Sequence, residues 1–230
     1  MANPIQHIPE KKSEVADSIV DAAERLLASF GYQKMTMTDL AAEAGIGVGT
    51  TYLHFASKAD VALAVVQRMH NRTLVELENL AGSADSPEVI LQRLLWHRVN
   101  SPYQMVRAKL ATTSWQQLRR HGAEFMDEVW SSDATRLKQL IHSEALIIAA
   151  VISDGIVKGV FLNVDPMETA STYFDTIYGF MPKNLCPHDF SEPGYFELRV
   201  KRVIRLLINS ILNERDTDGI SIDKEKPTDH

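Results

Sequence analysis

Apolar residues recur at three- and four-residue steps through most of this chain, which is the spacing that places them on one face of a helix. The first such stretch covers residues 13–30, where Val15, Ile19 and Leu26 share a face, and Gly31 follows it. Strands need an alternation of apolar and polar residues, because successive side chains point to opposite faces of a sheet. No such alternation persists, so the chain is predicted to be all-α.

Composition narrows the class of protein further. The 230 residues, 45% of them hydrophobic, are enough to bury a core in one large or two smaller domains. The N-terminus lacks a signal-peptide pattern, no stretch approaches about 18 uninterrupted apolar residues, and the single cysteine, Cys186, forms no intrachain disulfide. These features predict a cytoplasmic protein without a membrane partner. The net charge of −6 argues against nonspecific nucleic-acid binding by the whole surface, so any such contact must be local.

Two short helices separated by a tight turn are expected between Thr36 and Phe55. Thr36 or Thr38 can cap the first, which is rich in alanine and ends at Gly45, and the second covers residues 48–55. With the preceding amphipathic helix, this is the pattern of a helix-turn-helix, whose second helix enters the major groove of DNA. A longer helix is expected from residue 58 towards residue 80.

The rest of the chain is also predicted to be helical. Helices are expected over residues 88–99, 101–115, 123–160, 167–180 and 195–212, the third of them with a bend near Gly155 or Gly159. Residues 181–194 contain three prolines and are expected to form a loop. We therefore divide the chain into a DNA-binding domain (1–60), a helical effector-binding and dimerisation domain (61–213) and a disordered polar tail (214–230).

Over residues 19–61 the sequence resembles the tetracycline-repressor (TetR) family of bacterial regulators, and beyond them the similarity is weaker and mostly architectural. The matching residues are Ala22, Ala23, Phe30, Gly31, Tyr32, Thr36, Met37, Asp39, Leu40, Ala41, Ala44, Gly45, Ile46, Gly49, Thr50, Tyr52, Leu53, His54, Phe55, Ser57 and Lys58. The resemblance implies a homodimer, formed through the last two long helices, that binds a pseudo-palindromic operator in double-stranded DNA. It also implies a repressor that a small, largely apolar effector releases, and no cofactor.

The contacts with DNA are expected to come from the helix-turn-helix and its flanks. The residues expected there are Thr36, Thr38, Gly47, Val48, Gly49, Thr50, Thr51, Tyr52, His54 and Lys58. Thr36, Tyr52 and His54 can donate to phosphate oxygens, and Lys58 adds a positive charge beside a helix start. Packing for Tyr52 and His54, and a solvated surface position for Lys58, are the structural alternatives.

Base reading is assigned to Val48, Thr50 and Thr51, because apolar groups can contact thymine methyl groups and hydroxyls can bond base edges. Leu53 shares the face that is expected to be free for DNA. Gly47 stands where the family usually has a capping serine, and Val48 where it often has a basic residue. Both changes remove polar contacts.

The predicted DNA-binding domain is acidic. Residues 1–60 contain five Lys and Arg against eight Asp and Glu, a net charge of −3. Few phosphates can therefore be neutralised by full charges, which predicts modest affinity for each half-site and a shallow salt dependence of binding.

The second domain holds all three tryptophans among helices that also carry a few polar groups, a composition that suits a small-molecule pocket. The candidate ligand-binding residues are Arg93, Trp96, His97, Tyr103, Arg107, Trp115, Phe125, Trp130, Phe161 and Phe174. For each aromatic residue taken alone, ordinary core packing is the stronger interpretation.

Other functions have less support. No nucleotide-binding glycine loop, paired metal motif or nucleophile elbow is present, so no enzyme activity is predicted. Cys186 and His188 lack the further ligands of a tetrahedral site, so no metal is expected. A regulator controlled by a protein partner or a co-repressor remains the alternative, and it would show an exposed apolar patch in place of an enclosed cavity.

Overall fold

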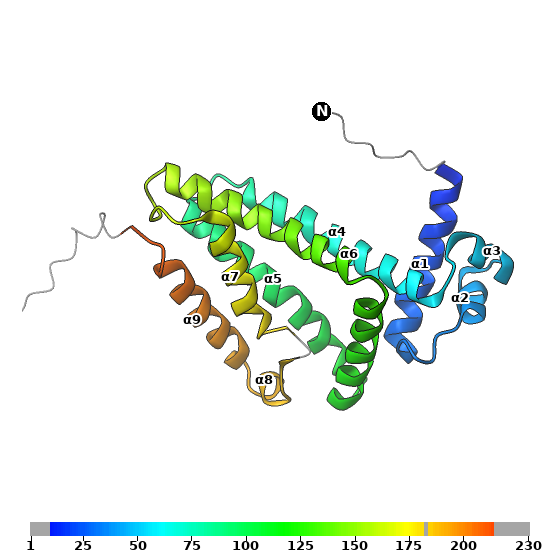
Figure 1. Ribbon diagram of the computed structural model, residues 1–230. Coiled ribbons are helices and arrows are strands. Elements are labelled where there is room, and N and C mark those ends of the chain that lie inside the picture. The colour runs from blue at the N-terminus through cyan, green and yellow to red at the C-terminus, as the bar shows by residue number, and fades with distance from the viewer. Residues whose placement is uncertain (1–9, 182–183, 214–230) are drawn as a thin grey trace, which may run out of the picture.

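The computed structural model describes residues 10–181 and 184–213, and within these ranges it is built from helices without a strand (Figure 1). The helices are α1 (Glu10–Phe30), α2 (Met37–Ala44), α3 (Val48–His54), α4 (Lys58–Ala81), α5 (Pro87–Lys109), α6 (Trp115–Val157), α7 (Pro166–Tyr178), α8 (His188–Ser191) and α9 (Tyr195–Asn209). A single antiparallel bridge joins Phe161 to Leu212. The prediction of an all-α chain is confirmed, and the predicted tail lies outside the described residues.

Helices α1, α2 and α3 form a unit at one end of the molecule, which we call the N-terminal unit (Figure 1). Its core contains Ile19 of α1, Leu40 of α2 and Val61 of α4, all fully buried. Arg68 of α4 pairs with Asp17 of α1 at 2.9 Å and also with Asp21 on the same helix. The N-terminal unit is therefore tied to α4 by both apolar packing and ion pairs.

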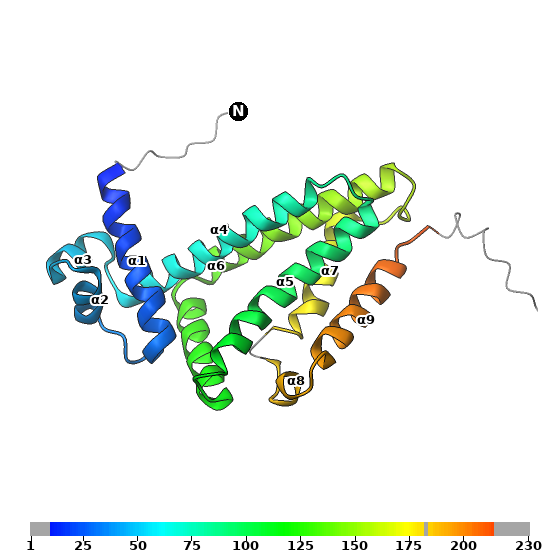
Figure 2. The ribbon, with the colours of Figure 1, turned by 180° about the vertical axis from the view of Figure 1, so that it is seen from behind.

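The remaining helices surround a second core. Helix α4 runs beside the C-terminal half of α6, and the two views agree on this arrangement (Figures 1 and 2). Helix α6 also packs against α5 and α7, and α9 packs against α5. By length and composition alone α6 is apolar enough to cross a membrane, with a mean hydropathy of 1.8 over 18 residues. Here its apolar residues, including Ile148 and Ile152, are part of this core.

Two predicted helix boundaries are wrong. Pro102 does not start a helix, because α5 continues through it. Gly122 does not interrupt the chain either, because α6 runs from Trp115 to Val157. The bend in α6 lies at Asp133 (φ −155°, ψ 77°) and not near the two glycines named above. The carboxylate of Asp133 accepts the N–H of Arg136 at 2.8 Å, so it caps the second half of α6 as a new helix start.

Glycines mark two other features of this region. Gly159 (φ 73°) has the left-handed conformation that follows the end of α6. Gly155 is helical, and a Cβ atom at this position would lie 2.1 Å from the ring of the buried Phe161. Gly155 therefore does not bend the helix. Its missing side chain leaves room for the Phe161 ring. The loop expected over residues 181–194 contains the short helix α8 after Pro187.

A buried polar cluster joins three helices of the second core. Glu144 of α6 is 3% exposed, and it lies 2.8 Å from Nδ1 of His70 on α4 while also accepting a hydrogen bond from Nε of Arg98 on α5. The other ring nitrogen of His70 lies 2.9 Å from the hydroxyl of Ser143. This cluster was not predicted, and its one signal in the sequence is a glutamate within an apolar helical stretch.

Candidate nucleic-acid interface

Local hydrogen bonds define the start and end of α2. The Thr36 hydroxyl accepts the Asp39 N–H at 3.1 Å, and the Asp39 carboxylate accepts the Thr36 N–H at 3.0 Å, which completes a capping box. Thr36 is thus the cap, and Thr38 lies exposed in the first turn. Gly45 ends α2 in the left-handed conformation (φ 68°), which directs the chain into α3.

Helix α3 starts without a side-chain cap, because its N-cap residue is Gly47. Seven residues are too few for a stable isolated helix, so packing must hold α3 in place. Thr51 supplies part of that packing: it is fully buried, and its hydroxyl has no hydrogen-bond partner. Phe55, which follows α3, packs against the core of the N-terminal unit. The expectation that Thr51 reads a base is therefore wrong, because its side chain faces the protein.

The opposite side of α3 is exposed and largely apolar. Leu53 is 78% exposed, Tyr52 53% and Val48 38%, while Thr50 and His54 are half-buried. The structure therefore brings four of the predicted contact residues, Val48, Thr50, Tyr52 and His54, onto or beside one accessible surface. Leu53 was placed on this face by its sequence position, but only its exposure reveals how far it projects.

Lys58 is held by the protein itself. Its Nζ donates to the backbone oxygen of Tyr32 at 3.1 Å and lies 4.1 Å from the centroid of the Tyr32 ring. These contacts join the start of α4 to the loop between α1 and α2. A phosphate contact by Lys58 would have to replace or extend them.

The Tyr32 hydroxyl has a shifted pKa, which can be tested by measuring stability against pH. Burial, reinforced by the nearby Glu128 carboxylate, raises the pKa of Tyr32 to about 12. The folded protein thus retains this proton at pH values where an unfolded chain, with a tyrosine pKa of about 10, has lost it. The resulting stabilisation is complete below pH 10 and is expected to disappear as the pH rises from about 10 to about 12.

The measurement is the free energy of unfolding in urea from about pH 9 to about pH 11 for the native sequence and for Tyr32→Phe. The variant cannot titrate at this position, so its stability is expected to fall less over that interval. Other tyrosines and the lysines titrate in both proteins and cancel in the comparison. Parallel pH profiles would show that Tyr32 does not contribute in this way.

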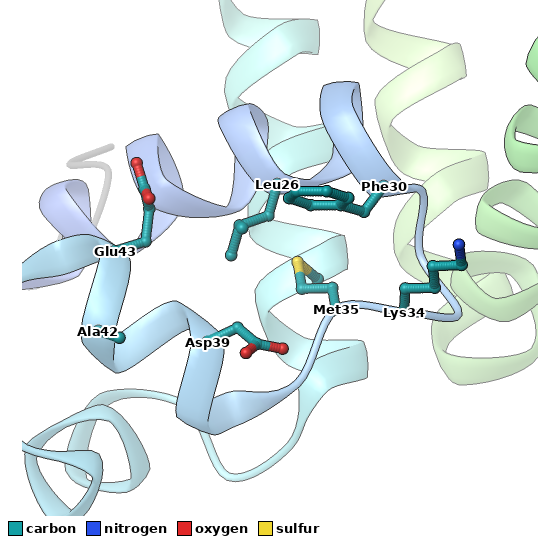
Figure 3. Close-up of a pocket in the computed structure, with 7 residues that line it drawn as sticks. All are labelled: Leu26, Phe30, Lys34, Met35, Asp39, Ala42 and Glu43. Carbon is teal, nitrogen blue, oxygen red and sulfur yellow. The ribbon is translucent and has the colours of Figure 1, made fainter.

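A cavity of about 490 Å³ lies between α1 and α2 (Figure 3). It is lined by Leu26, Phe30, Lys34, Met35, Asp39, Ala42 and Glu43. Arg25 and Glu43 form an ion pair of 2.5 Å beside it. No residue of α3 lines this cavity, so it is separate from the exposed face described above.

The aromatic residues predicted to bind a ligand are divided between the two cores. Tyr103 is buried, with its ring stacked on Phe196 at a centroid distance of 3.7 Å, and Trp115 packs 5.0 Å from Phe190. Trp96 packs against the same core, as does Phe161, which is buried there. Phe125 and Trp130 pack instead against the core of the N-terminal unit. Helix α6 therefore contributes side chains to both cores, with Trp115 in the second core and Phe125 and Trp130 against the first.

The polar candidates are each engaged with a carboxylate. Arg93 pairs with Asp85, His97 lies 2.7 Å from Glu76, and Arg107 lies 3.8 Å from Glu197. Their assignment to ligand binding stays a prediction. Of the ten candidates, Phe174 lines a space of about 220 Å³ between α6 and α7. The other residues of this cavity are Lys138, Ile141, His142, Ala145, Met167, Ser171 and Asp175.

The loop containing Cys186 is held by contacts with the carboxylate of Asp189. The thiol lies 3.2 Å from the carboxylate of Asp189, which also accepts the Cys186 N–H at 2.8 Å and pairs with Arg199. Within residues 10–181 and 184–213, no group of three or more His, Cys, Asp or Glu side chains is arranged to hold a metal ion.

Comparison with known proteins places the helix-turn-helix in a family. Residues 19–65 match the family model described as bacterial regulatory proteins, tetR family. The HTH-type transcriptional regulator TtgR of Pseudomonas putida is 25% identical over 130 residues, 54% of this chain and 58% of the relative. An uncharacterized HTH-type regulator of Haemophilus influenzae is 32% identical over 69 residues, 30% of this chain. The chain thus covers 58% and 37% of the lengths of these relatives.

Solved structures share the fold over most of the chain. A TetR transcription regulator from Haloarcula marismortui has a TM-score of 0.65 at 20% identity and covers 87% of this chain and 100% of its own. FadR from Bacillus subtilis, solved in complex with stearoyl-CoA, has a TM-score of 0.59 at 19% identity and covers 85% of this chain and 98% of its own. These identities are low, so the two structures support the fold of both halves and leave the ligand open.

Proposed function

Because this chain belongs to the tetR family of bacterial regulatory proteins, we propose that it is a transcriptional repressor that binds a pseudo-palindromic operator as a homodimer. The observation that carries the proposal is the exposed face of α3, a short helix held on its opposite side by buried Thr51. A supported helix with one free face is what insertion into a major groove requires. A cytoplasmic location is part of the same proposal.

Few basic side chains of the N-terminal segment are available for the proposed contact with DNA phosphates. Arg25 is engaged with Glu43 and Lys58 with Tyr32, so two of the five basic residues of the acidic segment 1–60 already have internal partners. Thr36 already donates its hydroxyl and its N–H to the Asp39 carboxylate, so phosphate contacts then depend on neutral donors such as Tyr52 and His54. Binding is therefore expected to weaken only modestly as salt is raised, because few counterions are released.

The proposed dimer uses the outer sides of α7 and α9. Helix α9 is amphipathic, with Leu198 and Leu206 exposed beside its basic residues, and Leu206 is 69% exposed. The outer side of α7 carries Glu168 and Asp175. In an isologous contact, α7 of one copy can face α9 of the other, which brings opposite charges and apolar side chains together.

An apolar effector is proposed to shift the dimer away from the DNA-binding state. FadR from Bacillus subtilis, one of the similar structures, is solved with stearoyl-CoA. In this chain the space between α6 and α7, lined by Ile141 and Phe174, is the candidate entry point in the second core. Binding there would act by stabilising a conformation with a different spacing of the α3 helices.

The dispersed positions of the aromatic candidates favour a second possibility, control by a protein partner or co-repressor. Exposed apolar side chains such as Leu146 and Val157 of α6 could contribute to such a surface. A regulator of this type would bind DNA in the same way. It would differ in that no small apolar compound would release it.

The test is an unbiased selection of DNA sequences bound by the purified full chain at low and moderate salt. A palindromic sequence is expected to be enriched at both. His54→Ala is expected to weaken binding to it about tenfold, because a hydrogen bond to a charged phosphate is lost. His188→Ala, which removes an exposed histidine on α8, serves as the control and is expected to bind normally. No enriched sequence at any salt would contradict the proposal.

A further inference from the structure

The outermost ridge of α3 consists of Gly49 and Leu53. A helix turns about 100° per residue, so the residues two before and two after buried Thr51 point away from the core and lie one turn apart. Leu53 is the most exposed large apolar side chain of the N-terminal unit. Val48 and Tyr52 flank the ridge, and no Lys, Arg, Asp or Glu occurs within α3.

The fold does not require a glycine at position 49. Its φ is not in the left-handed region, and a Cβ atom built there would meet nothing within 4 Å. Glycine is nevertheless one of the least favourable residues within a helix, and α3 is too short to tolerate such losses easily. Because Gly49 has no side chain, another molecule can approach the helix backbone closely here, beside the projecting Leu53.

The chemistry of this ridge selects among the base pairs. In the major groove only thymine presents an apolar group, its 5-methyl, whereas guanine, cytosine and adenine present donors and acceptors. A leucine packed against those polar base edges would displace the water bound to them, and it could not form the hydrogen bonds that the water had made. Arginine and lysine, the usual partners of guanine, are missing from α3.

We propose that Leu53, above the space left by Gly49, reads thymine methyl groups, so that the operator positions under α3 are T·A base pairs. This inference rests on the proposed operator binding. It makes Leu53 a specificity-determining residue and gives Gly49 the role of admitting the DNA. Thr50 lies beside the ridge, and its hydroxyl is available to bond a base edge next to the thymine methyl group.

The first experiment replaces thymine by uracil in the selected operator, which removes only the 5-methyl groups. The native protein is expected to bind the uracil operator about fourfold more weakly for each methyl contacted, the factor that corresponds to burying one methyl group. Leu53→Ala is expected to bind the thymine operator more weakly and to lose the discrimination between thymine and uracil. Leu162→Ala, an equally simple truncation of an exposed leucine that follows α6, is expected to retain it.

Two outcomes would overturn the inference while leaving operator binding intact. One is equal binding of the thymine and uracil operators by the native protein. The other is full discrimination by Leu53→Ala. If no sequence is bound specifically, the proposed function fails as well, and the two failures are thereby distinguished.

Gly49→Ala separates binding from folding. The added methyl meets open space in the isolated protein, so the Tm is expected to rise by about 1 to 4 °C while operator binding falls at least about tenfold. Gly122→Ala is the matched control, because a Cβ at this helical glycine of α6 also meets nothing within 4 Å. It is expected to raise the Tm similarly without changing DNA binding. Unchanged operator affinity in Gly49→Ala would overturn the role given to this residue.

Discussion

Glu144→Ala is expected to lower the free energy of unfolding by about 3 to 5 kcal/mol. The carboxylate is almost completely buried and is shared by His70 of α4 and Arg98 of α5. Removing it leaves the Arg98 guanidinium, which is only partly exposed, without its acceptor in a region of low dielectric constant. The measurement is urea denaturation at a fixed protein concentration, because the proposed dimerisation would make stability depend on concentration.

Two comparisons make this prediction specific. Glu78→Ala removes an exposed glutamate from α4 and is expected to change stability by less than about 0.5 kcal/mol. The double variant Glu144→Leu with Arg98→Met removes both charges, and it is expected to recover part of the loss because no unpaired charge remains buried. A Glu144→Ala protein as stable as the native one would show that the cluster does not hold α4, α5 and α6 together.

Phe161→Ala is expected to cost about 3 to 5 kcal/mol, since it removes a fully buried ring and leaves a cavity beside α6. The ring packs so closely on Gly155 that a Cβ there would overlap it. Gly155→Ala alone is therefore also expected to destabilise the protein, by about 1 to 3 kcal/mol, because the ring must move.

The double variant Gly155→Ala with Phe161→Ala tests whether these effects share one cause. The new methyl group can occupy part of the cavity, so the two losses are expected to be less than additive. Gly122→Ala provides the matched glycine substitution without a neighbouring ring. Additive losses in denaturant unfolding would mean that Gly155 and Phe161 act independently.

Several features of the helix-turn-helix were predictable because their causes are local. The capping box of Thr36 and Asp39 spans three residues, as does the one formed by Ser57 and Asp60 at the start of α4. Gly45 ends α2 through its own backbone conformation. Such signals need no tertiary contact to be interpreted, and the family resemblance covers the same segment.

The orientation of α3 was less predictable. With only seven residues, one wrong assignment moves a side chain from the core to the DNA face, as happened for Thr51. Charge was also only partly informative. The sequence shows that segment 1–60 is acidic, but the structure shows that Arg25 and Lys58 have internal partners.

The amino-acid sequence by itself determined the helical class and the location of the helix-turn-helix, and it reduced the cap of α2 to Thr36 or Thr38, because these depend on periodicity and on residues a few positions apart. Only the tertiary structure decided where the aromatic residues of the second half lie. Phe125 packs against the core of the N-terminal unit, and His70 meets Glu144 across 74 residues of sequence. Contacts over such separations depend on how whole helices pack, which no local pattern encodes.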